Sequence, residues 1–200
     1  MNEAEEIITW AECQAISEGL IAAAKNFEDS MYQEFLEKQG LYILCYDGIE
    51  LGGSLWGEPE PPIIYIGRIG PDSARHWRDN TGKSTVRRSL AAMLANTLSL
   101  QSIPGSEDPN DNDRYMNYRL TAESEDRLTE WMKANIKVAF WELGAGQVEP
   151  NYLALINCNT PKLNFQGNPH NTFGQQIKSY RKILAAMAMT YDNQNNAGKQ

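Results

Sequence analysis

Residues 62–75 read PIIYIGRIGPDSAR, an apolar run that ends in a tyrosine, glycines and arginines rather than in the small polar residues that suffice for a turn. The first part, IIYIG, is short and rich in strand-forming residues. The glycines after Tyr65 allow the backbone to approach a ligand closely, and the planar guanidinium groups of Arg68 and Arg75 suit phosphate oxygens. This stretch therefore predicts a strand whose end meets a phosphate group.

A second run of the same kind, GLYILCY, covers residues 40–46 and contains Tyr42. If the two runs pair as strands, the phenols of Tyr42 and Tyr65 can lie at the same edge of one small sheet. Tyrosine and isoleucine are also ordinary strand residues. On these residues alone, an alternative stays open in which both tyrosines are core phenols bonded to the backbone.

The remaining sequence predicts helices around this sheet. Apolar residues recur at helical spacing across residues 3–38, which predicts two helices. Residues 105–113, GSEDPNDND, hold four acidic residues, a proline and no apolar residue, and are expected to form a loop. The fold class is therefore expected to be α+β, with further strands at 115–120 and 137–143 and further helices at 73–80, 84–98, 124–135, 149–157 and 173–189.

The length and composition favour one compact domain. The chain has 200 residues, of which 42% are hydrophobic, enough for one well-formed core. We expect an acidic N-terminal helical extension over residues 1–39, a core over 40–168, a C-terminal helix over 169–189 and a disordered tail over 190–200. No apolar run approaches the roughly 18 residues of a membrane span, and the start MNEAEEIITW is acidic, so we expect a cytoplasmic protein without a membrane partner.

The distribution of charge matters more than the net value of -8. Residues 1–39 hold nine acidic and two basic residues, whereas residues 63–90 hold six basic and two acidic residues. A basic window of this kind suits a partner that carries phosphate groups. The alternative is a solvated helix face, which charge alone does not exclude.

Two other features are weak signals for other kinds of site. Residues 82–85, GKST, match the end of a phosphate-binding P-loop, but that motif needs a glycine five positions before Gly82, where Trp77 stands. No nucleotide cofactor is therefore expected. His76 and His170 are the only histidines, and the three cysteines are far apart, so neither a zinc site nor a disulfide framework is indicated.

The two strand-like runs, GLYILCY and IIYIG, together resemble the signature of the GIY-YIG nuclease superfamily. Gly40-Leu41-Tyr42 is similar to the first half, with leucine in place of the middle isoleucine, and Tyr65-Ile66-Gly67 is similar to the second. The family places a basic residue three positions after the second tyrosine and an arginine about ten positions after it, which corresponds to Arg68 and Arg75.

The later part of the chain also resembles this family. The family has a glutamate on a helix, which binds a metal ion, and then an asparagine after a proline. The sequence VEPNYLALINCNTPKLN supplies Glu149, Pro161 and Asn164 in that order. The resemblance covers roughly residues 40–168, and GKSTVRRSL, LTEWM and PKLNFQGNP are similar to a bacterial branch.

The chain departs from the family pattern in several places. An insertion rich in glycine and proline separates Tyr42 from Tyr65. The basic residue after the YIG run is often lysine, and Arg68 stays charged, so it cannot act as a neutral proton acceptor. Asp79 stands where many members have a histidine or tyrosine. Glu142, on an expected strand, is the alternative to Glu149 as the metal ligand.

The resemblance implies a small central antiparallel sheet in mixed order, flanked by helices, and a metal-dependent endonuclease that hydrolyses DNA. Glu149 would hold Mg²⁺ or Mn²⁺, for which one carboxylate is sufficient. Tyr65 would accept the proton of the attacking water and Tyr42 would orient that water. Arg75 would stabilise negative charge on phosphorus, and Asn164 would position Glu149 or a phosphate oxygen. Contacts to the DNA backbone would come from Arg78, Lys83, Arg87 and Arg88.

A binding module that keeps this fold without catalysis is the alternative function. The acidic segments 1–39 and 105–113 would suit a surface for a protein partner, and a protein partner or a homodimer would add specificity to so small a core. Each site residue also has a structural alternative: core phenols for the tyrosines, a helix-cap partner for Arg75, a helix N-terminal carboxylate for Glu149 and a turn for Asn164. The presence of both tyrosines and Arg75 favours the nuclease.

Overall fold

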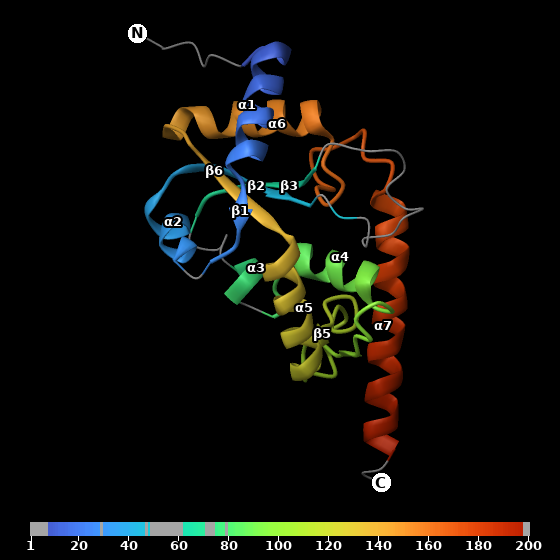
Figure 1. Cartoon of the computed structure of the whole chain (residues 1–200). Helices are drawn as coiled ribbons and strands as arrows, with labels where there is room; N and C mark the ends of the chain where they lie inside the picture. The colour runs from blue at the N-terminus through green and yellow to red at the C-terminus, as the bar shows by residue number, and fades with distance from the viewer. Residues whose placement is uncertain are drawn as a thin grey trace. The chain divides into compact units, whose positions relative to one another are not determined.

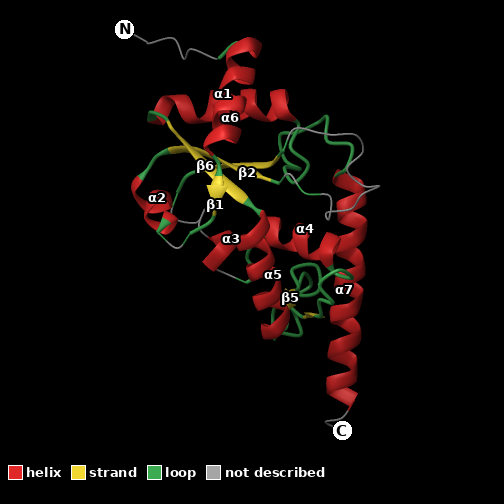
Figure 2. Cartoon of the chain, viewed as in Figure 1, coloured by secondary structure: helices red, strands yellow, loops and turns green. Residues whose placement is uncertain are grey.

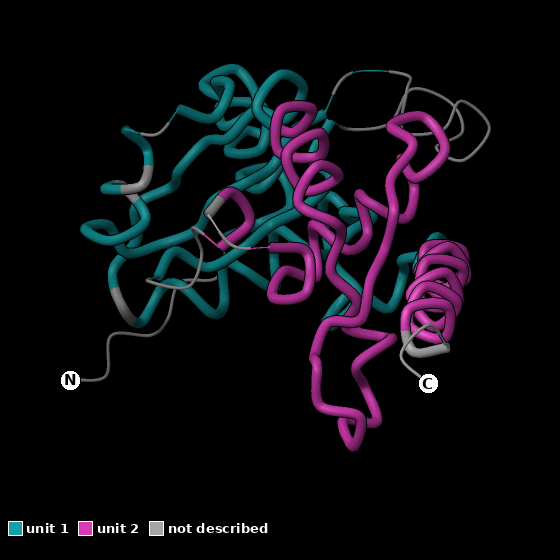
Figure 3. Tube along the Cα trace, turned by 90° about the horizontal axis from the view of Figure 1, so that it is seen from below, with its two compact units in different colours: residues 1–49, 56–74, 133–174 teal, residues 50–55, 75–132, 175–200 magenta. Residues whose placement is uncertain are grey.

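The computed structural model describes residues 8–28, 30–46, 48, 62–70, 75–78 and 80–197. Its internal contacts divide the chain into two units (Figure 3). Unit 1 comprises residues 1–49, 56–74 and 133–174, and unit 2 comprises residues 50–55, 75–132 and 175–200. The glycine- and proline-rich insertion between the two tyrosine strands lies almost entirely outside the described residues.

Unit 1 contains a four-stranded antiparallel sheet with the strand order β1-β6-β2-β3. Figure 2 draws the strands in yellow. The strands are β1 (Lys25–Asn26), β2 (Gly40–Cys45), β3 (Ile63–Arg68) and β6 (Lys137–Glu142). The two runs singled out in the sequence are β2 and β3, and they pair directly, with Tyr42 opposite Gly67. The central strand β2 is buried along its whole length. The strand β1 was not predicted, because two residues are too short to show a period.

Helices cover both faces of this sheet (Figure 1). On one face, α1 (Trp10–Ala23) and α6 (Val148–Asn159) pack against it. That core contains the sheet residues Leu41, Ile43, Ile66 and Ala139 and the helix residues Cys13, Leu20, Leu155 and Ile156. On the other face, Phe35 of α2 (Met31–Glu37) meets the rings of Tyr42 and Phe140 at 5.1 and 5.0 Å between centroids. The α+β fold class with a helix-flanked antiparallel sheet and an N-terminal helix is confirmed.

A short irregular segment completes unit 1 along the outer edge of β3. In the chain, β6 is followed by a single 3-10 turn (Ala145–Gln147), then by α6, and then by this segment. The N–H of Leu163 donates to the carbonyl of Ile64 at 2.9 Å, which satisfies an edge group that β2 cannot reach. The polypeptide after α6 therefore protects the exposed edge of the sheet.

Unit 2 is mainly helical. It contains α3 (Arg75–Arg78), α4 (Thr85–Leu94), most of α5 (Ala122–Asn135) and most of α7 (Gly174–Ala197), with a two-stranded pair of β4 (Ser102–Ile103) and β5 (Arg119–Leu120). Leu90, Leu94, Tyr118 and Leu128 are fully buried there. The hydroxyl of Ser102 donates to the carbonyl of Leu184 at 2.6 Å, which attaches β4 to α7.

Three sequence predictions need correction in unit 2. The strand expected at 115–120 is reduced to Arg119–Leu120, because turns precede it, as the bond from the N–H of Tyr118 to the carbonyl of Tyr115 shows. The helix expected over 84–98 ends at Leu94. The helix expected to stop at residue 189 continues to Ala197, because the polar residues there contain no breaker and Asp192 pairs with Arg114 at 2.9 Å.

The length and hydropathy of the helices also bear on membranes. Within the described part of the chain, none of them is long and apolar enough to cross a bilayer.

Candidate active site

An exposed arginine and an exposed glutamate meet at the end of β3. Arg68 is the last residue of β3, and Glu149 lies in the first turn of α6. The Nε of Arg68 donates to Oε2 of Glu149 at 2.9 Å and an Nη donates to Oε1 at 2.8 Å. This is the fork geometry in which a guanidinium binds a carboxylate or a phosphate. The side chains are 46% and 61% exposed, so both groups face solvent.

Tyr152 packs against the arginine of this pair. It lies three residues after Glu149, on the same face of α6, and is buried. The guanidinium carbon of Arg68 lies 3.7 Å from the centroid of its ring, a cation–π contact. The sequence interpretation did not select Tyr152. The signal that could have found it is the spacing of an acid and an aromatic residue at i and i+3 on one helix.

Asn164 fastens the edge of β3 with its side-chain amide. Its Oδ1 accepts from the N–H of Ile66 at 2.9 Å, and its Nδ2 donates to the carbonyl of the same residue at 2.8 Å. The Nδ2 also lies 3.3 Å from the hydroxyl of Tyr152. Asn164 is only 4% exposed, so these partners are fixed. Asn164 is thus linked through Tyr152 to the Arg68–Glu149 pair.

Two further asparagines hold the segment that carries Asn164. The Nδ2 of Asn168 donates to the carbonyl of Pro161 at 2.9 Å, and that of Asn171 donates to the carbonyls of Lys162 and Asn164, each at 2.8 Å. Short amide side chains often satisfy irregular backbone in this way. The asparagine-rich sequence 164–171 therefore builds the support for the site.

The two tyrosines of the signature lie side by side, as their strand positions predict. Their ring centroids are 5.9 Å apart, and the rings are inclined at 49°. Tyr42 is 2% exposed and lies across Gly67, where an added Cβ would overlap its ring. The glycine of the YIG run is therefore required by the tyrosine of the neighbouring strand.

The pleat of β3 separates these phenols from the acidic residue. Successive side chains point to opposite faces of a sheet, so Tyr65 faces the side of α2, whereas Arg68 faces the side of α6. The structure thus brings together Arg68, Glu149 and Asn164 of the predicted site and places Tyr42 and Tyr65 together on the other face.

The remaining predicted site residues belong to unit 2, where they have different environments. Arg75 begins α3 and is partly buried, whereas Lys83 is exposed just before α4. The side chain of Arg78 lies outside those that the structure describes. Arg88 is 8% exposed and donates to the carbonyl of Thr81.

Arg87 has a structural role that differs from the backbone contact expected of it. It is 1% exposed and forms an ion pair of 2.7 Å with Glu125. It also donates to the carbonyl of His76 at 3.1 Å and to the hydroxyl of Thr129 at 2.9 Å. A guanidinium enclosed in this way is not available to DNA, because both of its Nη groups already donate within the protein and its Nε is buried.

His76 also serves the interior of unit 2. Its Nδ1 lies 2.7 Å from the hydroxyl of Ser84, the residue that caps α4. Burial lowers the pKa of His76 to about 3, with further lowering from Arg75 and Arg87. The imidazole is therefore neutral near pH 7 and suits the structural role expected from the sequence.

The donor set near Glu149 fits one hydrated divalent ion. Among the described residues there is no group of three or more histidines, cysteines and acids that could enclose a metal. The Glu149 carboxylate is well exposed, and a carboxylate that accepts from one arginine keeps further lone pairs. Mg²⁺ needs only one or two such ligands, because water and substrate complete its shell. The alternative ligand, Glu142, pairs with Lys38 at 2.6 Å.

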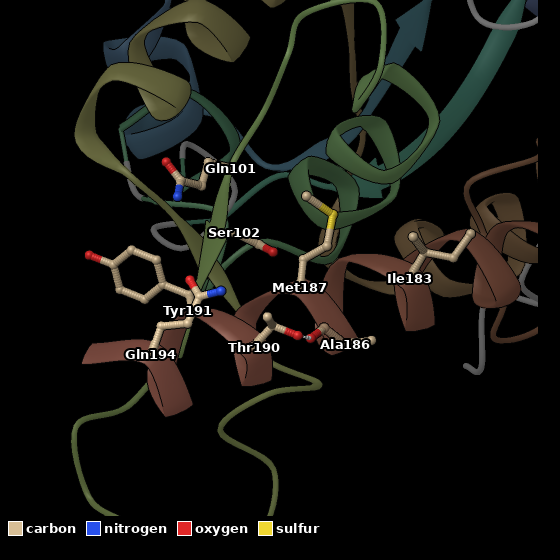
Figure 4. Close-up of a pocket in the computed structure, with 8 residues that line it drawn as sticks. All are labelled: Gln101, Ser102, Ile183, Ala186, Met187, Thr190, Tyr191 and Gln194. Carbon is tan, nitrogen blue, oxygen red and sulfur yellow. Dashed lines mark hydrogen bonds between the residues drawn. The ribbon is translucent and has the colours of Figure 1, made fainter. Parts of the chain in front are cut away.

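A groove in unit 2 has a different character (Figure 4). It has a volume of about 460 Å³ and lies between the Gln101–Ser102 segment and α7. Its lining residues are Gln101, Ser102, Ile183, Ala186, Met187, Thr190, Tyr191 and Gln194. These contain no acid, histidine or basic group, and Thr190 donates to the carbonyl of Ala186 within its own helix. This groove lacks the groups that phosphodiester hydrolysis requires.

Comparison with known proteins identifies the family that the sequence motifs resemble. A family model described as the GIY-YIG catalytic domain, which is a nuclease-type domain, matches residues 58–183. The match includes Tyr65, Arg68, Arg75, Glu149 and Asn164, whereas Tyr42 precedes it. No curated protein and no solved structure matches the chain. Because the matched segment covers more than half of its length, the chain belongs to the GIY-YIG catalytic domain family.

Proposed function

We propose that this chain is a metal-dependent endonuclease that hydrolyses DNA phosphodiester bonds at the Arg68–Glu149 pair. The observation that carries the proposal is this exposed pair, held by Tyr152 and Asn164 within the segment that matches the family. A carboxylate and a guanidinium side by side supply the two complementary charges that phosphate chemistry needs.

Glu149 would hold a Mg²⁺ or Mn²⁺ ion through its exposed carboxylate. When bound, the ion supplies Lewis-acid stabilisation of charge on the phosphate and leaving oxygens. In the free protein, Arg68 neutralises this carboxylate. Because both side chains are about half exposed, their pairing contributes only about 0–1 kcal/mol, so a phosphate oxygen can replace Glu149 as the partner of Arg68 at little cost.

Tyr152 and Asn164 act as positioning residues. The ring of Tyr152 limits the guanidinium of Arg68 to one plane, and the amide of Asn164 fixes both the tyrosine and the end of β3. A side chain that is already oriented loses less conformational entropy when it binds substrate.

The roles of the remaining residues follow from their exposure. Tyr65 is partly exposed, and we retain it as the proton acceptor for the attacking water, whereas the buried Tyr42 supports it by packing. Of the residues in unit 2, Arg75 and the exposed Lys83 would contact phosphate groups of the DNA.

A binding module without catalysis is the second candidate. It is favoured by one observation: Tyr65 and Glu149 lie on opposite faces of the sheet, so a single phosphate does not readily meet both. In that case the chain would bind DNA or a protein partner through the same fold.

The test is incubation of the purified protein with supercoiled plasmid and with flap and junction oligonucleotides in Mg²⁺ or Mn²⁺. We expect nicking that EDTA abolishes and that Arg68→Gln and Tyr65→Phe reduce. Full cleavage by Tyr65→Phe would place proton transfer elsewhere. Absence of cleavage by the folded protein on every substrate, with DNA still bound, would favour the binding module.

A further inference from the structure

Two cysteines of unit 1 lie on helices that pack against each other. Cys13 lies on α1 and Cys158 on α6, and both are free thiols. Cys13 is part of the core that these helices form with the sheet, and Cys158 packs against that core. The proposed function uses neither residue.

The sulfur of Cys13 lies beside the last turns of α6. Its Sγ is 3.6 Å from the carbonyl oxygen of Ala154. In an α-helix the carbonyl of residue i accepts from the N–H of residue i+4, so this oxygen also accepts from the N–H of Cys158. Because such a bond spans about 3 Å, the Sγ of Cys13 is at most about 7 Å from the backbone nitrogen of Cys158. The two cysteines are therefore neighbours across the contact of α1 with α6.

A second contact fixes the two helices on the other side of Cys158. The Nδ2 of Asn159, the next residue, donates to the hydroxyl of Ser17 at 2.9 Å. That hydroxyl donates in turn to the carbonyl of Cys13 at 2.8 Å. Ser17 and Asn159 are both buried. Cys158 is thus held between two fixed contacts that α6 makes with one turn of α1.

This placement is compatible with a disulfide. A disulfide links Cα atoms that are about 4.4–6.8 Å apart, and rotation about χ1 moves each sulfur around its own Cα. A sulfur that already lies next to the helical turn of its partner therefore needs little movement of the backbone. Burial, followed by the neighbouring thiol of Cys158, raises the pKa of Cys13 to about 12.

The two thiols differ in their access to an oxidant. Cys13 is 2% exposed, whereas Cys158 is partly exposed. The thiolate is the form of cysteine that reacts with peroxides, and the reaction requires access. Cys158 is therefore the residue that a small peroxide oxidises first, and the buried Cys13 is placed to react with the oxidised sulfur.

We propose that Cys13 and Cys158 form a reversible disulfide that joins α1 to α6 when hydrogen peroxide oxidises them. The sulfur of Cys158 attacks a peroxide oxygen, the O–O bond breaks, and a sulfenic acid and one water form. The sulfur of Cys13 then bonds to that of Cys158, the S–O bond breaks, and the departing hydroxide takes up the thiol proton of Cys13 as a second water. Two thiols are thus oxidised to one disulfide while one peroxide is reduced to two waters. A thiol reductant reverses the bond by exchange.

The disulfide would act on the helix that carries the candidate site. The same helix, α6, holds Glu149 and Tyr152, and the bond to α1 would close a long loop of the chain. Closing a long loop stabilises the folded protein mainly by restricting the unfolded chain. The pair uses neither a metal ion nor DNA, so it stands or falls separately from the proposed nuclease activity.

The first test is peptide mapping of the purified whole chain after treatment with hydrogen peroxide. The remaining thiols are alkylated in denaturant, and the chain is digested without a reductant. We expect a monomer in which the peptides of Cys13 and Cys158 are joined, while Cys45, which is buried in β2, is alkylated. Dithiothreitol should release the two peptides. Absence of this cross-link, a cross-link between two chains, or equal yields of pairs with Cys45 would overturn the proposal.

Thermal unfolding provides a second measurement, and two variants separate this pair from oxidation elsewhere. Peroxide should raise the unfolding temperature of the wild type by roughly 5–10 °C, because the disulfide closes a long loop. The control Cys45→Ala should show the same rise relative to its own reduced form, whereas Cys158→Ser should show none. An equal rise in Cys158→Ser, or no rise in the cross-linked wild type, would contradict a pair that the fold already holds in place.

Discussion

Asn164→Ala is expected to destabilise the fold and, through it, the site. The change leaves the N–H and the carbonyl of Ile66 without partners at a position that is fully buried. Each buried polar group left unsatisfied costs about 1–3 kcal/mol, so the free energy of unfolding should fall by roughly 2–6 kcal/mol. Urea denaturation measures this fall as a lower midpoint with an unchanged slope.

Asn164→Asp separates this structural role from a direct role on substrate. Aspartate still accepts from the N–H of Ile66, but it places a carboxylate oxygen against the carbonyl that Nδ2 now binds. We therefore expect it to destabilise the protein about as much as alanine does. Asn157→Ala, an exposed change on α6, is the control and should cost little. Normal stability together with lost cleavage in Asn164→Ala, or normal stability in Asn164→Asp, would refute this reasoning.

Three further predictions concern the fold around the site. Glu125→Ala should lower the free energy of unfolding by about 3–5 kcal/mol in urea denaturation, because it leaves the charge of Arg87 buried and unpaired. Gly67→Ala should cost about 1–3 kcal/mol in the same assay, since its Cβ overlaps the ring of Tyr42. The pKa of His76 is lowered from 6.5 to about 3 in the folded protein. As the pH falls, this histidine therefore binds a proton in the unfolded chain before it does so in the folded one. Stability measured at several pH values should be full above about pH 6.5, fall towards pH 3 by at most about 1.4 kcal/mol per pH unit, and fall less in His76→Gln.

Matched exposed positions serve as controls for these three changes. Glu123→Ala removes an ion pair whose carboxylate side chain is 83% exposed and should cost less than about 1 kcal/mol. Gly146→Ala adds a Cβ that meets nothing within 4 Å. His170→Gln changes an exposed histidine and should leave the pH dependence of stability as it is. Equal effects at a site and at its control would show that burial is not the cause.

The pairing of β2 and β3 could be predicted because each strand carries its own local signal. Each strand is a run of apolar strand formers with a glycine, at the start of β2 and near the end of β3, and pairing of the two runs makes the tyrosines neighbours. The alternation of side chains along β3 also follows from its sequence, because it holds in any strand whatever its register. Because Tyr65 and Arg68 are three residues apart, they fall on opposite faces. The sequence motif, which shows only their order along the chain, suggests that they form one cluster.

The contacts that support the site could not be predicted from local sequence patterns. Arg68 and Glu149 are 81 positions apart in the sequence, and only the packing of α6 on the sheet brings them together. Tyr152 looked like a core aromatic residue, which it also is. Burial of Arg87 and Arg88 was likewise hidden, because a basic run on a helix normally indicates a solvated face.

The most direct test of the proposed chemistry compares Glu149→Gln with Glu142→Gln in single-turnover cleavage at saturating Mg²⁺. Both remove an exposed carboxylate that pairs with a basic side chain, so they differ mainly in position. Loss of the proposed metal ligand removes several kcal/mol of transition-state stabilisation, so Glu149→Gln should cleave at least about a hundredfold more slowly, while Glu142→Gln keeps its rate. A normal rate in Glu149→Gln, or an equal loss in both, would contradict a site centred on Glu149.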